Sequence, residues 1–148
     1  MAERKVVLLV EDNPDDRDLT LRAFERHQFG NAVVTVPDGQ AALDHLHAPG
    51  PDGAPRPLPE IVLLDLKLPK VDGLEVLRRI RANDRTRLLP VIVLTSSAEE
   101  QDLVQSYELG ANSYVRKPVS FTEFMEASRQ LGMYWLVLNR QPPRSEPE

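Results

Sequence analysis

The chain has 148 residues, of which 41% are hydrophobic and 28% charged, and it contains no cysteine. This length suffices for one ordinary hydrophobic core and is too short for two full domains. Without cysteine there can be no disulfide framework and no thiolate nucleophile or metal ligand. The net charge of −5 opposes nonspecific binding to nucleic acid, so we expect no nucleic-acid partner.

The start of the chain carries no targeting pattern. Residues 1–5 are polar and lead into an apolar run that is too short for a signal peptide or a membrane span. We therefore expect no membrane partner and a cytoplasmic location.

The first half of the chain alternates apolar runs with helical patterns. Residues 6–10 read as a strand, and Asn13 followed by Pro14 predicts a helix over residues 14–28. Residues 31–36 read as a second strand, after which Asp38 and Gly39 open a second helix. Residues 48–59 are rich in proline and glycine and predict a loop within the same domain, because the next strand, 60–64, is needed to complete a sheet.

Three later helices begin with a capping pattern, in which an Asp or Ser precedes a Glu by three residues. Asp72 with Glu75 opens a third helix that ends near Asn83. After a strand at 91–94, Ser97 with Glu100 predicts a fourth helix, closed by Gly110; after a strand at 114–116, Ser120 with Glu123 predicts a fifth. Five strands in strict alternation with five helices indicate an α/β fold with a doubly wound parallel sheet.

The end of the fifth helix is unusual. An inward stripe is predicted at Phe121, Phe124, Met125, Leu131, Trp135 and Leu138, yet residues 133–138 are apolar all round. Such a run is either a well-buried last turn or a surface for self-association. For the second case we expect a homodimer through Met133, Tyr134, Leu136 and Val137. The domain is expected to cover residues 1–138, and residues 139–148 are predicted to form a disordered polar tail.

Chemically useful residues follow four of the predicted strands. Glu11 and Asp12, Asp65, Thr95 and Lys117 each stand where an apolar run ends. The carboxyl ends of parallel strands meet at one edge of the sheet, so these residues should form one site. Two carboxylates about 4 Å apart repel by about 4 kcal/mol, and one lysine cannot neutralise three of them. Either protons are held at raised pKa or a divalent cation binds, and oxygen ligands suit Mg²⁺.

The same residues indicate phosphoryl chemistry. Asp65 can act as a nucleophile and form an acyl phosphate, with Mg²⁺, the Lys117 ammonium and the Thr95 hydroxyl around the phosphoryl oxygens. Lys117 precedes Pro118, and the sequence leaves open whether the bond between them is cis or trans.

These motifs resemble the receiver domain of two-component response regulators. The similarity covers about residues 5 to 138 and rests on Glu11 with Asp12, the run from Asp65 to Gly73, Thr95 with Ser96, and Lys117 with Pro118. The resemblance implies a flavodoxin-like sheet of order 2-1-3-4-5, with a partner histidine kinase as phosphodonor. It also implies a signalling protein that catalyses only its own phosphotransfer and dephosphorylation and is otherwise no enzyme.

The resemblance assigns a role to each site residue. Asp65 would be the phosphoacceptor, and Mg²⁺ would be held by Glu11, Asp12, Asp65 and the backbone carbonyl of Lys67. Thr95, Ser96 and Lys117 would bind the phosphoryl group, and Thr95 and Tyr114 would switch with it. The departures are Glu11, where many relatives have Asp, and Lys67 and Ser97, which stand where side chains influence water access to the phosphoryl group. Lys67 bears on the lifetime of the phosphorylated state.

A finer resemblance is to single-domain regulators that serve phytochrome-type histidine kinases. It rests on the NPDD sequence at 13–16, the proline-rich loop, YELGAN at 107–112, and the region of Tyr134 and Trp135 with a short tail. Two alternatives remain: a degenerate receiver acting as an interaction module without phosphorylation, and a phosphatase of the haloacid-dehalogenase type. The phosphatase needs a second aspartate two residues after the nucleophile, where this chain has Lys67.

Overall fold

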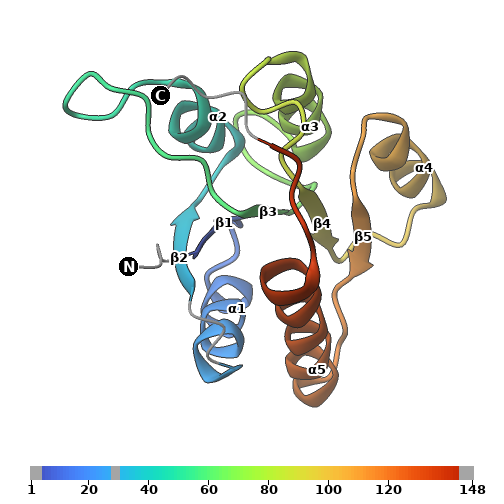
Figure 1. Cartoon of the computed structure of the whole chain (residues 1–148). Coiled ribbons are helices and arrows are strands. Elements are labelled where there is room, and N and C mark those ends of the chain that lie inside the picture. The colour runs from blue at the N-terminus through green and yellow to red at the C-terminus, as the bar shows by residue number, and fades with distance from the viewer. Residues whose placement is uncertain (1–4, 28–30, 144–148) are drawn as a thin grey trace.

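The computed structural model describes residues 5–27 and 31–143. In those ranges five parallel strands form one sheet in the order β2-β1-β3-β4-β5, with helices on both faces (Figure 1). The predicted doubly wound α/β fold is confirmed. The strands are β1 (Lys5–Val10), β2 (Asn31–Val36), β3 (Ile61–Leu64), β4 (Val91–Thr95) and β5 (Ser113–Arg116). The helices are α1 (Pro14–His27), α2 (Gly39–His47), α3 (Gly73–Ala82), α4 (Glu100–Glu108), α5 (Phe121–Gly132) and a π-helix, η1 (Met133–Leu138).

The centre of the sheet is covered on both sides. Every residue of β3 and β4 is buried, whereas the edge strands β2 and β5 are mostly half-buried. α1 and α5 cover one face of the sheet, and α2 and α3 lie together on the other (Figure 1). This two-sided burial explains why β3 and β4 are continuously apolar in sequence.

The helix starts follow their predicted caps with one exception. Side-chain oxygens of Asp38, Asp72 and Ser120 each accept a hydrogen bond from the backbone N–H three residues later. The predicted capping box at Ser97 is wrong, because α4 begins after Glu99 and the Ser97 hydroxyl bonds Asp102 at 2.6 Å instead. The predicted first helix extends to residue 28, which lies outside the described residues.

The C-terminal helix changes its winding after Gly132. Residues 133–138 form the π-helix η1, which has more residues per turn than an α-helix. The inward stripe predicted at α-helical spacing is therefore wrong for Leu138, which is 63% exposed. It is also wrong at its other end, because Phe121 is 54% exposed. Leu136 was predicted to lie in a dimer interface, but it is 1% exposed and packs in the core, so that assignment is wrong for Leu136.

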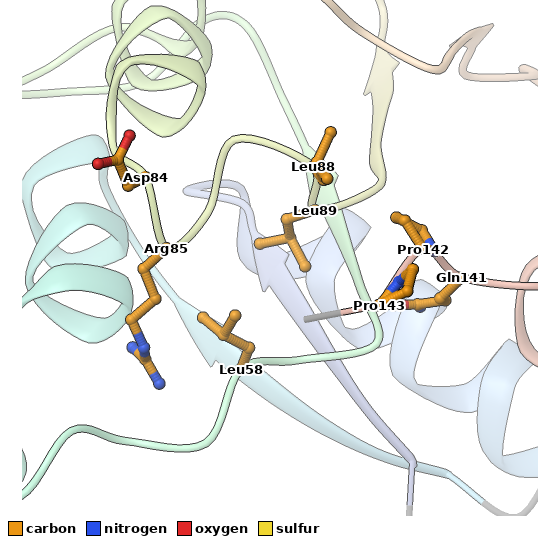
Figure 2. A pocket seen from close by; sticks show the side chains of 8 residues that line it. All are labelled: Leu58, Asp84, Arg85, Leu88, Leu89, Gln141, Pro142 and Pro143. Carbon is orange, nitrogen blue, oxygen red and sulfur yellow. The ribbon is translucent and has the colours of Figure 1, made fainter. Parts of the chain in front are cut away.

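Residues 139–143 return across the amino-terminal edge of the sheet. The Gln141 side-chain amide donates to the carbonyl oxygen of Glu60, just before β3. Pro142 and Pro143 line a small pocket of about 20 Å³ whose other walls include Leu58 and Leu89 (Figure 2). Residues 139–143 have no regular secondary structure, and the disorder of the tail stays a prediction. Residues 144–148 lie outside the described part of the chain.

Candidate functional site

A buried lysine stands among carboxylates at the carboxyl edge of the sheet. The Lys117 ammonium donates to Glu11 Oε1 at 2.6 Å and to Asp65 Oδ2 at 3.0 Å. It also donates to Asp16 Oδ2 at 2.9 Å. The side chains of Lys117, Glu11 and Asp65 are only 7%, 2% and 9% exposed, so little solvent screens their charges. The expected convergence of the strand ends is therefore present for these three residues.

The register of the strands sets this geometry. Val10 pairs with Leu64 across β1 and β3, so Glu11 and Asp65 begin side by side one residue later. The backbone N–H of Asp65 donates to the Val10 carbonyl at 3.1 Å, which continues the ladder to the site. Lys117 enters from β5 in the same way, because its backbone N–H donates to the Thr95 carbonyl at 2.7 Å.

Local backbone contacts hold the Asp65 carboxylate in place. Its Oδ1 accepts the Leu66 N–H at 2.7 Å, while Oδ2 faces Lys117. The following helix starts very close to this loop, because a Cβ atom at Gly73 would lie 2.3 Å from the Asp65 carbonyl oxygen. Only glycine permits that approach, which accounts for Gly73 at the start of α3.

Burial and ion pairing act in opposite directions on the two central charges. Burial raises the pKa of Glu11 to about 7, although the hydrogen bond and the charge of Lys117 act to lower it. Burial acts to lower the pKa of Lys117, but the hydrogen bonds to Glu11 and Asp16 and the charge of Asp65 outweigh it and raise that pKa. Lys117 therefore stays protonated, and Glu11 is the group poised to exchange a proton near neutral pH.

Three carboxylates can supply ligands for one cation. One oxygen from each of Glu11, Asp12 and Asp65 lies within 4.8 Å of the others, and Asp12 is exposed. An open cleft beside them is lined by Asp12, Lys67 and other residues of the loop after β3. Acidic oxygens next to an open cleft fit Mg²⁺, which keeps several waters when it binds to proteins.

Apart from Lys117, the predicted phosphate and switch residues lie around Ser97. Thr95 is fully buried, and its hydroxyl oxygen accepts the Ser97 N–H at 3.3 Å. The Tyr114 hydroxyl donates to the Ser97 carbonyl at 3.4 Å. Ser96, which lies between Thr95 and Ser97 in the sequence, is exposed. None of the peptide bonds in the described ranges is cis, so the Lys117–Pro118 bond is trans.

Two acidic residues in this region were missed from sequence. Asp16, in the first turn of α1, contacts Lys117, and its position just beyond the Asn13 cap was the available signal. Asp102 is 8% exposed on α4 and pairs with Lys67 Nζ at 3.5 Å. Asp102 and Ser106 are buried four residues apart while apolar Val104 and Tyr107 are exposed, a reversal that hydrophobic periodicity could not predict.

Comparison with known proteins gives matches over most of the chain. The family model of the response regulator receiver domain matches residues 7–129. The probable methanogenesis regulatory protein FilR2 of Methanothrix harundinacea is 46% identical over 137 residues, which are 93% of this chain and 87% of the relative. The response regulator Rcp1 of Synechocystis sp. is 37% identical, with 89% of each chain covered.

Solved structures agree with this chain in fold and extent. The crystal structure of the Mn²⁺-bound form of response regulator Rcp1 has a TM-score of 0.85 and 36% identity, covering 94% of this chain and 99% of that one. The phosphorylated cyanobacterial phytochrome response regulator RcpA has a TM-score of 0.87 and 35% identity, covering 95% and 100%. The family match, these structures and the strand-end cluster together show that the chain belongs to the response regulator receiver domain family.

Proposed function

We propose that Asp65 accepts a phosphoryl group from a partner histidine kinase and that the chain signals through the resulting change of shape. The observation that carries this proposal is the buried Lys117 ammonium, which holds Asp65 at 3.0 Å beside the cation-binding carboxylates. A nucleophile, a fixed positive charge and cation ligands are the groups that phosphoryl transfer to a carboxylate requires.

Each residue of the site has a separate part in the proposed phosphoryl transfer. An Asp65 carboxylate oxygen attacks phosphorus of the donor phosphohistidine, the new O–P bond forms as the N–P bond breaks, and the histidine nitrogen keeps the electron pair of that bond. Lys117 neutralises negative charge on the phosphoryl oxygens, and Thr95 and Ser96 bind those oxygens. Mg²⁺, held by Glu11, Asp12, Asp65 and the Lys67 carbonyl, supplies further neutralising charge when bound. Apart from phosphorylation and dephosphorylation of itself, the chain catalyses no reaction in this proposal.

The partner kinase is proposed to be of the phytochrome type. Support comes from the likeness to the cyanobacterial phytochrome response regulator RcpA and from the motifs at residues 13–16 and 107–112. The proposed donor kinase takes its phosphoryl group from ATP inside the cell, so a cytoplasmic location is part of the proposal. None of the described helices is long and apolar enough to cross a membrane.

The test is transfer of a radiolabelled phosphoryl group. A phytochrome-type histidine kinase, labelled with ATP, is mixed with this chain and Mg²⁺, and a light-insensitive histidine kinase serves as the control donor. We expect faster labelling by the phytochrome-type kinase. Equal rates from both donors would contradict the phytochrome link, and no label from any donor would leave the interaction-module alternative as the better description.

The affinity for Mg²⁺ should depend on pH through Glu11. Burial raises the pKa of this group to about 7, so below that pH a cation must displace its proton. We expect the apparent dissociation constant for Mg²⁺ to rise about tenfold per pH unit below pH 7 and to change little above pH 8, measured by titration calorimetry. The Glu11→Gln variant should bind more weakly and with a flatter profile. An affinity that is constant between pH 6 and pH 8 would contradict the role of Glu11.

We also propose that a second copy of the chain covers the exposed apolar side of η1. Four side chains form this surface, and they are between 39% and 63% exposed: Met133, Tyr134, Val137 and Leu138. Leu136 supports it only from beneath, because it is buried in the core. Adjacent exposed apolar side chains of this kind are typical of interfaces.

The dimer is tested by mass in solution. We expect analytical ultracentrifugation at micromolar concentrations to give the mass of two chains, and Val137→Glu to give one chain, because the interface would bury an unpaired charge. Val104→Glu is the matched control, since Val104 is similarly exposed at 48% but lies on α4. A single-chain mass for the natural sequence, phosphorylated or not, would rule out this proposal.

A further inference from the structure

A buried carboxylate next to the phosphoacceptor site has no role in the chemistry described so far. Asp102 lies on α4 and is 8% exposed, and its Oδ2 accepts the Ser97 hydroxyl at 2.6 Å. The same oxygen lies 3.5 Å from Lys67 Nζ. A buried charge is costly unless it is paired, so these two partners stabilise Asp102 in its present position. Asp102 therefore connects α4 to the loops that follow β3 and β4.

Both partners of Asp102 touch the predicted reaction centre. Lys67 is two residues after Asp65, and its backbone N–H is 3.5 Å from Asp65 Oδ1. Ser97 donates its N–H to the Thr95 hydroxyl and accepts the Tyr114 hydroxyl on its carbonyl. A displacement of Lys67 or Ser97 therefore changes a contact of Asp102.

The Lys67 ammonium can pair with more than one anionic group. It is 65% exposed and lines the open cleft together with Asp12 and Asp102. Phosphorylation replaces the single negative charge of the Asp65 carboxylate by about −2 on the phosphoryl oxygens, which is larger than the single charge of Asp102. Because the Lys67 side chain is exposed and long, it can leave Asp102 for the phosphoryl oxygens without disturbing the core.

We propose that Asp102 is a positioning residue that holds the Lys67 ammonium on α4 until Asp65 is phosphorylated. Phosphorylation then draws Lys67 away, leaves Asp102 with Ser97 alone, and so loosens the contact of α4 with the site. This proposal rests on phosphorylation of Asp65, and it makes the lifetime of the acyl phosphate a result of competition between Asp102 and the phosphoryl group for one lysine.

The main test is a double-mutant cycle on the half-life of the phosphorylated chain. Asp102→Asn keeps an acceptor for the Ser97 hydroxyl but removes the charge that holds Lys67, so Lys67 shields the phosphoryl group more of the time. We expect the half-life to lengthen about fivefold, the size set by an ion pair with one exposed partner. In a Lys67→Gln background the same substitution should have no effect. Glu100→Gln, an exposed acid on the same helix, should leave the half-life unchanged.

The outcomes separate this proposal from the proposed function. A half-life that Asp102→Asn leaves unchanged, or lengthens equally with and without Lys67, overturns the positioning role while Asp65 remains the phosphoacceptor. If the natural chain takes up no label, the proposed function fails, and the unphosphorylated chains still test the ion pair. Denaturant midpoints of the natural chain, the two single variants and the double variant should then be non-additive. Additive midpoints would show that Asp102 does not hold Lys67, and Asp102→Ser, which also removes the carboxylate, completes the cycle if Asp102→Asn does not fold.

Discussion

Asp65→Asn is expected to take up no phosphoryl group from acetyl phosphate with Mg²⁺, under conditions in which the natural chain takes up one. The asparagine amide is not a nucleophile, so no acyl phosphate can form. Intact-mass spectrometry measures the result directly. The loss should be complete, because no other carboxylate within residues 5–27 and 31–143 contacts both Lys117 and the backbone amide that holds Asp65.

The loss should be chemical and not a failure to fold. Asparagine has nearly the shape of aspartate and can still accept the Leu66 N–H, so we expect the free energy of unfolding to change by about 1 kcal/mol or less. Asp72→Asn is the matched control, since Asp72 lines the same cleft and caps α3, a role that asparagine fills equally well. Unchanged labelling of Asp65→Asn, or loss of labelling in Asp72→Asn, would contradict the assignment of Asp65.

Lys117→Met should damage both stability and phosphorylation. The substitution leaves Glu11 and Asp65 buried together without their cation, and removing one partner of a buried ion pair costs about 3 kcal/mol or more. Urea denaturation without Mg²⁺ measures this loss. Phosphorylation by acetyl phosphate should slow about a hundredfold, because a fixed charge that stabilises the transferred group is gone.

The stability loss of Lys117→Met should shrink as pH falls. In the natural chain the pKa of Glu11 is raised from 4.5 to about 7, so burying the charged form costs stability that grows as pH rises through this window and vanishes below about 4.5. Without Lys117 the pKa of Glu11 rises further, because the ion pair that acts to lower it is lost. The variant should therefore be less impaired at pH 5 than at pH 8.

Addition of Mg²⁺ should also restore part of the stability of Lys117→Met, because the cation binds the folded carboxylates and not the unfolded chain. The control is Lys70→Met. Lys70 is 70% exposed and pairs with Asp38 at 3.6 Å, so its loss should cost less than about 1 kcal/mol and respond neither to pH nor to Mg²⁺ in this way. A variant of Lys117 as stable as that of Lys70 would disprove the central role of the buried ammonium.

The sheet and its carboxyl edge were predictable because each depends on local patterns. Fully buried parallel strands are continuous apolar runs, and the residues that follow them must meet when the strands are in register. Glu11, Asp65 and Lys117 could therefore be placed together before their distances were known. Asp38, Asp72 and Ser120 were recognisable as caps because a cap depends only on neighbours three residues away.

The contacts that escaped prediction depend on tertiary packing. Ser97 satisfies a capping pattern, but a buried carboxylate at Asp102 takes its hydroxyl, so α4 starts later. The inward stripe of α5 was extended past Gly132 at α-helical spacing, and the π-helix then turns Leu138 outward and Leu136 inward. No local sequence signal distinguishes the two windings in an apolar run.

The segment at 139–143 also decides where the chain can be extended. It leads the backbone away from η1 to the amino-terminal edge of the sheet, where Gln141 meets Glu60, at the opposite end of the strands from Asp65. A fluorescent protein or affinity handle attached after residue 143 would leave the domain at that far edge, away from the cleft beside Asp65. One inserted directly after Leu138 would instead displace the prolines from their pocket. Reporter chains should therefore keep residues 139–143 ahead of the linker.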